Sequence, residues 1–277
     1  MKAPSFDYVR PDTLDEALAL LGETARPIAG GQSLLPALNL RLADPALLVD
    51  IGRLAELQGV VCEGEVIRIG ALTRHAELLT SPVIAREAPL LARAAADVAH
   101  PAIRSRGTLG GSLAHADPAA ELSACILALG ARLHAQSAAR GHRVIAAEAF
   151  FTGLFSTALR PDELLVAVEL DRPAPDSAFG FGELTRRSGD YAMIGLAAHG
   201  RSIGGRFASL RLAFFGAGPA PVLARRAADA LVAQSTTPEA ALANDLAPHS
   251  DLQASATTRL HLAGVLLRRV VAGMAPA

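Results

Sequence analysis

Two short segments place adjacent glycines beside hydroxyl side chains. Residues 29–36 read AGGQSLLP and residues 107–112 read GTLGGS. Glycine adopts positive φ at no steric cost and lets the backbone approach a ligand closely. One Gly-Gly step is usually a structural turn. Two Gly-Gly steps with polar neighbours suggest a binding site for a pyrophosphate. Its two phosphates need several hydrogen-bond donors, which backbone N–H groups could supply from two sides.

Hydroxyl groups of Ser33, Thr108 and Ser112 could add donors to such a site. Neither glycine segment contains lysine or arginine, which favours an anion held by oriented amides. The spacing matches neither GxGxxG nor GxxxxGK[ST], so a Rossmann or P-loop reading fails.

Acidic side chains follow the second glycine segment, in the stretch AHADPAAEL. Asp117 could cap a helix and Glu121 could lie on a solvated helix face, and spacing alone favours these structural roles. The functional alternative is that one carboxylate accepts hydrogen bonds from ribose hydroxyls. His115 is interpreted as a polar neighbour and not as a catalytic base.

A third segment of interest is RRSGDYAM, residues 186–193. Tyr191 could fill the core, since buried tyrosines with a satisfied hydroxyl are common. Its place between Gly189-Asp190 and an apolar strand also suits a ring packed against a flat heterocycle. No Ser-His-Asp or Cys-His arrangement can be argued from the order of residues, and no histidines have metal-ligand spacing.

The elements that must position these segments follow from capping signals and periodicity. Helices are predicted over 13–21, capped by Thr13, within 33–45, over 72–82 and over 83–99, with a further helix starting at Asp117-Pro118. Strands are predicted over 46–52 and 163–171, and hairpins over 59–70 and 131–151. Both glycine segments are thus expected directly before helices, where anions bind.

A Pro-rich break at residues 172–177 separates this part from antiparallel strands and two or three Ala-rich helices. The fold class predicted for the chain is therefore α+β.

Composition excludes several classes of protein. The 277 residues have a net charge of −1 and 4% aromatic residues, which argues against nucleic-acid binding. Cys62 and Cys125 lie far apart, so no metal or iron–sulfur site is expected on this chain. No apolar run reaches the roughly 20 residues that span a bilayer, and the N-terminal stretch lacks a signal-like apolar region. We therefore expect a cytoplasmic protein.

The segments AGGQSLLP, IRSRGTLGGSLAHADPAAEL, LRPDELLVAVEL and ELTRRSGDYAMIGLAA together carry a resemblance. Their order over essentially the whole chain resembles the medium, FAD-binding subunit of the molybdenum hydroxylase family. The chain is similar to the medium subunit of aerobic carbon monoxide dehydrogenase and to the flavin domain of xanthine dehydrogenase.

The resemblance implies a PCMH-type FAD-binding domain over 1–174, in two parts of about 1–56 and 57–174. A smaller C-terminal α+β domain of the carbon monoxide dehydrogenase flavoprotein type would follow over 178–277. FAD would be the only cofactor on this chain, and no catalytic residue is expected beyond the flavin environment.

The FAD-binding residues that the resemblance implies fall into three groups. The two glycine segments would hold the pyrophosphate through Ile28, Ala29, Gly30, Gly31, Gln32, Ser33, Leu34, Thr108, Gly110, Gly111 and Ser112. Two acids, Asp117 and Glu121, would hold the ribose and adenine side. Leu165, Asp190 and Tyr191 would lie beside the flavin ring, with Arg186 or Arg187 nearby.

The resemblance also implies partners: a large subunit with a molybdenum cofactor and a small one with two [2Fe-2S] clusters, assembled as a dimer of heterotrimers. This chain would pass electrons from the clusters to an external acceptor. Relatives that use NAD can carry lysine just before the position of Glu183, where this chain has Gly182, so the acceptor stays open. The alternatives are a stand-alone FAD-dependent oxidase or reductase, and a scaffold subunit without cofactor.

Overall fold

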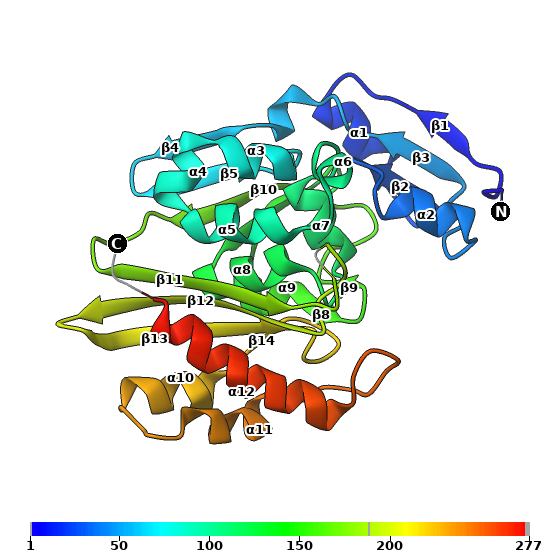
Figure 1. The fold of residues 1–277 in the computed structure, drawn as a ribbon. Coiled ribbons are helices and arrows are strands. Elements are labelled where there is room, and N and C mark those ends of the chain that lie inside the picture. The colour runs from blue at the N-terminus through cyan, green and yellow to red at the C-terminus, as the bar shows by residue number, and fades with distance from the viewer. Residues whose placement is uncertain (1, 188, 275–277) are drawn as a thin grey trace.

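The computed structural model describes residues 2–187 and 189–274. Figure 1 shows three larger sheets with helices between and around them. The N-terminal sheet is parallel, in the order β1-β3-β2. Its elements are β1 (Asp7–Val9), α1 (Leu14–Leu20), β2 (Ala25–Ile28), α2 (Leu34–Asn39) and β3 (Leu47–Asp50). The predicted cap of α1 is confirmed, because the Thr13 hydroxyl accepts a hydrogen bond from the Glu16 amide at 3.2 Å.

The middle sheet is antiparallel, in the order β4-β5-β10-β6-β7. Both predicted hairpins and the predicted strand at its centre are confirmed. The strands are β4 (Val60–Glu63), β5 (Val66–Gly70), β6 (Arg132–Ser137), β7 (Gly141–Ala146) and β10 (Leu164–Asp171), after a 3-10 turn η1 (Ala55–Leu57). One face carries Ile67, Ile69, Leu133 and Val168, which join the largest buried apolar cluster.

Helices cover that apolar face of the middle sheet. They are α3 (His75–Thr80), α4 (Pro82–Glu87), α5 (Pro89–Asp97), α7 (Leu109–His115), α8 (Glu121–Leu129) and α9 (Ala147–Phe150), with a small hairpin of β8 (Phe151–Gly153) and β9 (Ser156–Thr157). The short helix α6 (Pro101–Arg104) has no buried residue and lies against α3.

Two predicted helices have different bounds in the structure. The single helix expected over 83–99 is broken between α4 and α5, because Pro89 lacks an N–H and disfavours helical geometry at Ala88, which has φ −140° and ψ 53°. The helix expected to start at Asp117-Pro118 begins at Glu121. Residues 117–120 form a turn instead, in which the Asp117 carboxylate accepts from the Ala119 amide at 2.9 Å.

The C-terminal sheet is antiparallel, in the order β11-β12-β13-β14, as the sequence predicts for its first three strands. Its elements are β11 (Ser177–Leu184), β12 (Ile194–Ile203), β13 (Arg206–Phe215), β14 (Val222–Leu223), α10 (Arg225–Val232), η2 (Pro238–Ala241), α11 (Leu242–Asp245) and α12 (Ala256–Ala272).

Both faces of this C-terminal sheet are buried. Ala197, Ala213 and Phe215 face the cluster that contains α5 and α8, while Leu196 and Leu212 face the cluster of α10 and α12. This period-two alternation is why the sheet lies between two helical layers (Figure 1). The predicted α+β fold is confirmed. Over the described residues, no helix is both long and apolar enough to span a membrane.

Candidate functional site

The two glycine segments lie against each other, although about eighty residues separate them. A Cβ built on Gly30 would lie 2.1 Å from the Arg106 carbonyl oxygen and 3.0 Å from the Gly107 Cα. A Cβ on Gly111 would lie 3.9 Å from the Ala29 Cβ. Only residues without a side chain allow the backbones to approach this closely, so the glycines form one composite loop structure.

The first segment is a tight turn between β2 and α2. Gly31 has φ +71°, which favours glycine, and its carbonyl accepts from the Leu35 amide as α2 starts. The Gln32 side chain donates to the Gly30 carbonyl at 3.0 Å and so braces the turn. Ile28 ends β2, Ser33 is exposed, and Leu34 is the first residue of α2.

The second segment is the start of a helix and not a loop before one. Thr108 is the N-cap of α7, and its hydroxyl accepts from the Gly111 amide at 3.1 Å. Gly110 is buried against the end of β5, where a Cβ would lie 2.5 Å from the Ala71 Cβ. Gly111 is exposed and Ser112 half-buried. The two adjacent glycines therefore have different roles: Gly110 is needed for packing, while Gly111 leaves the outer surface of α7 open.

A buried histidine holds the backbone of the second segment. The His75 ring has 5% exposure, and its Nε2 lies 3.0 Å from the Thr108 carbonyl oxygen. Burial lowers the pKa of His75 to about 4, so the ring is neutral at pH 7 and its Nε2–H donates to this carbonyl. Sequence reasoning missed His75, because its contact with Thr108 spans 33 residues.

A cavity of about 60 Å³ lies between the segments and is lined by Ala29, Gly30 and Thr108 together with Arg74 and Arg106. The glycine segments themselves hold no basic side chain, as the sequence shows, but their neighbours bring two guanidinium groups into the site. Arg74 pairs with Thr108 as an isolated β-bridge and donates to the Ser105 carbonyl at 2.6 Å. Arg106 directly precedes the second segment, so the sequence contained this signal, whereas Arg74 comes from a distant element.

This cradle fits a diphosphate. Gly30 lets the two segments meet, Gly111 leaves the outer surface of α7 without a side chain, and two guanidinium groups outnumber the single carboxylate of Glu77 in the lining, so the cavity offers net positive charge to the phosphates. The amides of Leu109, Gly110 and Gly111 already donate within the protein. The sequence predicted the glycines of this site and missed its charged side chains.

The predicted acids lie beyond the other end of α7, in an acidic group in which Asp117, Glu121 and Glu183 are half-buried and Asp97 is exposed. Burial raises the pKa of Glu121 to about 7, and the nearby Asp117 and Asp97 add to the rise. Burial likewise raises the pKa of Glu183 to about 8, with Glu121 and Asp97 contributing. The Oε2 atom of Glu183 is buried without a hydrogen-bond partner among the described residues. A protonated carboxyl, or a ligand that donates a hydrogen bond, suits this position.

The Tyr191 ring is on the surface and not in the core, with 67% exposure. Partial burial and then the charges of Asp117 and Glu121 raise the pKa of its hydroxyl. Gly189 packs on His100, and the exposed Asp190 donates its amide to the Arg187 carbonyl. The structure therefore brings Tyr191 together with Asp117 and Glu121.

Leu165 has 3% exposure and lies within the largest apolar cluster. It lines neither the cavity between the glycine segments nor a larger cavity beside Tyr191. Its predicted contact with the flavin ring stays a prediction.

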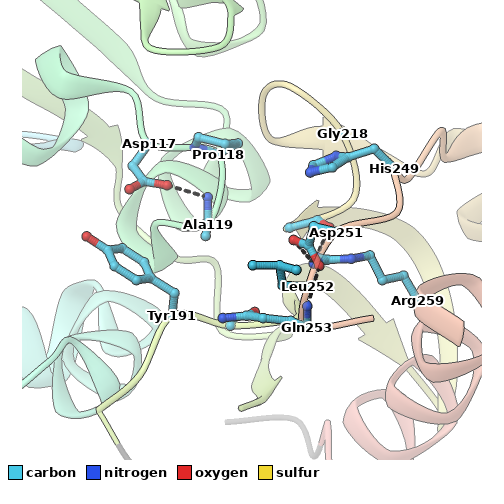
Figure 2. Close-up of a pocket in the computed structure, with 12 residues that line it drawn as sticks. Asp117, Pro118, Ala119, Tyr191, Gly218, His249, Asp251, Leu252, Gln253 and Arg259 are labelled. Atoms are coloured by element: carbon cyan, nitrogen blue, oxygen red, sulfur yellow. Dashed lines mark hydrogen bonds and ion pairs between the residues drawn. The ribbon is translucent and has the colours of Figure 1, made fainter. Parts of the chain in front are cut away.

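A larger cavity of about 410 Å³ opens beside Tyr191 (Figure 2). Its walls come from the turn Asp117–Ala119, from Tyr191 and Ala192, from Gly216 and Gly218, and from the segment 249–253 before α12. Sequence reasoning did not include residues 249–253 in the site, because nothing in their pattern ties them to Tyr191. Across the described residues, no group of three or more His, Cys, Asp or Glu is arranged to hold a metal ion.

Known proteins match the chain in two consecutive stretches. Residues 4–173 match the family described as "FAD binding domain in molybdopterin dehydrogenase", and residues 179–274 match "CO dehydrogenase flavoprotein C-terminal domain".

Individual relatives cover the same range. The chain is 49% identical to subunit alpha of the 6-hydroxypseudooxynicotine dehydrogenase complex of Paenarthrobacter nicotinovorans, over 72% of this chain and 68% of that one. It is 37% identical to the nicotine 6-hydroxylase medium subunit of the same organism, over 98% of both. A solved structure of carbon monoxide dehydrogenase from Hydrogenophaga pseudoflava superimposes with a TM-score of 0.94 at 34% identity, over 98% of both chains.

Proposed function

Because this chain belongs to the family of FAD-binding subunits of the molybdopterin dehydrogenases, we propose that it relays electrons through bound FAD to an external acceptor. The electrons come from two [2Fe-2S] clusters of a small partner subunit. A large partner subunit holds the molybdenum cofactor at which the substrate is hydroxylated. The three chains assemble as a dimer of heterotrimers.

The redox chemistry belongs to FAD, which takes up electrons singly from a cluster and delivers them in pairs. The residues of this chain bind and orient the cofactor. The backbone of Ala29–Gly31 and the exposed Gly111 lie against the pyrophosphate, and Arg74 and Arg106 offset its charge. Glu121 and Glu183 supply carboxyl groups beyond the far end of α7, and Tyr191 offers an aromatic face.

The observation that carries this proposal is the contact between Gly30 and the Arg106-Gly107 backbone. It joins the segment after β2 and the start of α7 into one cradle whose exposed glycine and guanidinium groups are suited to a diphosphate. Neither half of the cradle would hold a diphosphate alone.

The test is purification of the full chain from its native source without added cofactor. We expect FAD in stoichiometric amount, a larger partner containing molybdenum and a smaller one containing iron. A protein that carries FAD but purifies alone, and oxidises or reduces a small molecule by itself, would support the stand-alone oxidase or reductase instead. A chain that neither retains FAD nor takes it up on reconstitution would refute the proposal.

A further inference from the structure

Residues 71–75, which lead into α3, run antiparallel to the start of α7. The Gly110 amide donates to the Ala71 carbonyl at 2.8 Å, and the Leu109 amide donates to the Thr73 carbonyl at 2.9 Å. These two hydrogen bonds attach the first turn of α7 to the segment that follows β5. They do not hold the backbone just before α7, which is the part of the second glycine segment that meets the first one.

His75 holds that backbone with two groups. Its own amide donates to the Gly107 carbonyl at 2.9 Å, and its ring Nε2–H donates to the Thr108 carbonyl at 3.0 Å. The ring Nδ1 has no hydrogen-bond partner among the described residues, so the single proton of the neutral ring is used by the bond to Thr108. One residue of α3 therefore fixes two consecutive peptide groups.

The His75 ring also packs against the backbone of Gly107. A Cβ on Gly107 would lie 2.9 Å from the ring Nδ1 and 3.0 Å from the ring Cε1. Gly30 contacts the same stretch, because a Cβ there would lie 2.1 Å from the Arg106 carbonyl oxygen and 3.0 Å from the Gly107 Cα. The backbone of these two residues is thus in contact with the ring and with the first glycine segment, so a shift of the ring would change the gap between the segments.

His75 itself stays outside the cavity between the glycine segments. Arg74 and Glu77 come from the same end of α3 and line that cavity, whereas His75 does not. The ring can therefore influence a ligand only through the backbone that it holds. Such support matters because groups that bind a ligand have to be held within about 0.5 Å of their binding geometry.

We propose that His75 is a positioning residue for FAD: its hydrogen bond to the Thr108 carbonyl and its packing on Gly107 hold the cradle at the width that the pyrophosphate requires. The inference rests on the proposed function, since it takes the cradle to be the FAD site. It makes the affinity for the cofactor depend on a residue that does not touch the cofactor.

The experiment compares the affinity for FAD with the stability of the chain. The flavin-free full-length chain is titrated with FAD at pH 7, and its unfolding in denaturant is measured separately. His75→Leu removes the donor at similar side-chain size and should weaken FAD binding about threefold to tenfold. His75→Gln places an amide N–H where Nε2 stands, so it should keep binding within about twofold of the wild type.

His199→Leu is the matched control. His199 is a half-buried histidine of β12 in the C-terminal sheet, and its ring stacks on Phe179. Its Nε2 is likewise buried without a hydrogen-bond partner in the part of the chain that the structure describes. The control variant loses a ring of the same size and should leave the affinity for FAD unchanged.

Gly107→Ala tests the packing contact independently, and it serves if His75→Leu does not fold. The added Cβ would displace the ring and should weaken FAD binding by about tenfold. In a His75→Ala background the same change should have little further effect, because the ring atoms that the new Cβ would meet are absent.

The outcomes separate a positioning role from a merely structural one. Weaker FAD binding in His75→Leu, with binding kept by His75→Gln and by His199→Leu, supports the inference. A folded His75→Leu chain that loses stability but binds FAD as the wild type does would overturn it. Binding as weak in His75→Gln as in His75→Leu would overturn it too, as would an equal effect of Gly107→Ala with and without the ring. A wild-type chain that fails to bind FAD would refute the proposed function instead.

Discussion

At the scale of single residues, two neighbouring glycines illustrate how position decides role. Gly110 is buried against Ala71, and any side chain there would separate α7 from β5. Gly111 is exposed on the first turn of α7, and its amide reaches the Thr108 hydroxyl. Substitution of Gly110 would therefore disturb folding, whereas Gly111 is the position at which ligand binding can be tested separately from stability.

Gly111→Ala should weaken FAD binding by roughly 10- to 100-fold, which corresponds to the loss of about one charge-assisted hydrogen bond. The added Cβ would lie 2.8 Å from the Thr108 hydroxyl and occupy the outer surface of α7 that is proposed to face the pyrophosphate. Equilibrium titration of the flavin-free protein with FAD measures the change. Gly22→Ala is the control, since a Cβ there meets nothing within 4 Å. An affinity within twofold of wild type would contradict the role of Gly111.

Glu183 makes the stability of the flavin-free protein depend on pH. Burial raises its pKa from the ordinary 4.5 to about 8, so its contribution to stability is complete below pH 4.5 and is lost as pH rises through 8. Glu121, whose pKa is raised to about 7, also lowers the stability of the folded chain as pH rises, at slightly lower pH than Glu183. Glu183→Gln should therefore raise the melting temperature at pH 9 and change it little at pH 5.

Thermal melts followed by circular dichroism at pH 5, 7 and 9 measure this effect. Glu63→Gln removes an exposed carboxylate from β4 and serves as the control for net charge. Equal effects of Glu183→Gln at all three pH values would show that the carboxyl does not titrate in the expected window.

At the scale of elements, the half-buried Arg211 and the buried Arg259 join helices and strands that are distant in the sequence. Arg211 of β13 donates to the Leu127 and Ala128 carbonyls and so caps the C-terminal end of α8. Arg259 of α12 does the same for the carbonyls of Met193 and Gly216. These contacts fix the C-terminal sheet and helix against the turn that carries Tyr191.

Arg259→Gln should lower the free energy of unfolding by about 3 kcal/mol, because it leaves two buried carbonyls and Asp251 without their donor. Denaturant or thermal unfolding measures the loss. The control is Arg268→Gln on the same helix, whose ion pair with Glu239 is partly exposed on both sides and should contribute less than about 1 kcal/mol. Similar losses in both variants would show that Arg259 has no special structural role.

At the scale of the whole molecule, the cradle lies between the N-terminal and middle sheets. Gly30 follows the N-terminal sheet, and Arg106 and Thr108 come from the helical layer over the middle sheet. A ligand held by both parts binds the folded chain and not the unfolded one. FAD should therefore stabilise the molecule through linkage.

At free FAD one hundred times its Kd, the free energy of unfolding should rise by about 2.7 kcal/mol. For a chain of this size the melting temperature should then increase by roughly 5–10 °C. Differential scanning calorimetry with and without FAD measures the shift, and Gly111→Ala at the same FAD concentration should remove roughly half to five-sixths of it. A melting temperature that does not respond to FAD in the wild-type chain would contradict a cradle formed between the two parts.

The sequence by itself determined the element types and most of their order. Thr13 caps its helix as predicted, β4–β5 and β6–β7 pair as hairpins, β10 falls within its predicted range, and antiparallel strands follow residue 176, because caps, turns and alternation are encoded within a few residues. The prediction of one continuous helix over 83–99 was wrong, because the apolar residues on both sides of Pro89 were taken as one helical face although Pro89 breaks the helix. The family resemblance added the prediction that the two glycine segments hold the same pyrophosphate.

Only the tertiary structure decided which residues share a site. It brought Arg74 beside the glycines, buried Glu183 next to Glu121, and joined Tyr191 to Asp117 and to the segment 249–253 in one cavity. These contacts connect residues tens of positions apart, and they depend on how three sheets pack. Local patterns carry the preference of a residue for a helix, strand or turn, but burial, charge pairing and cavity shape arise only when distant segments meet.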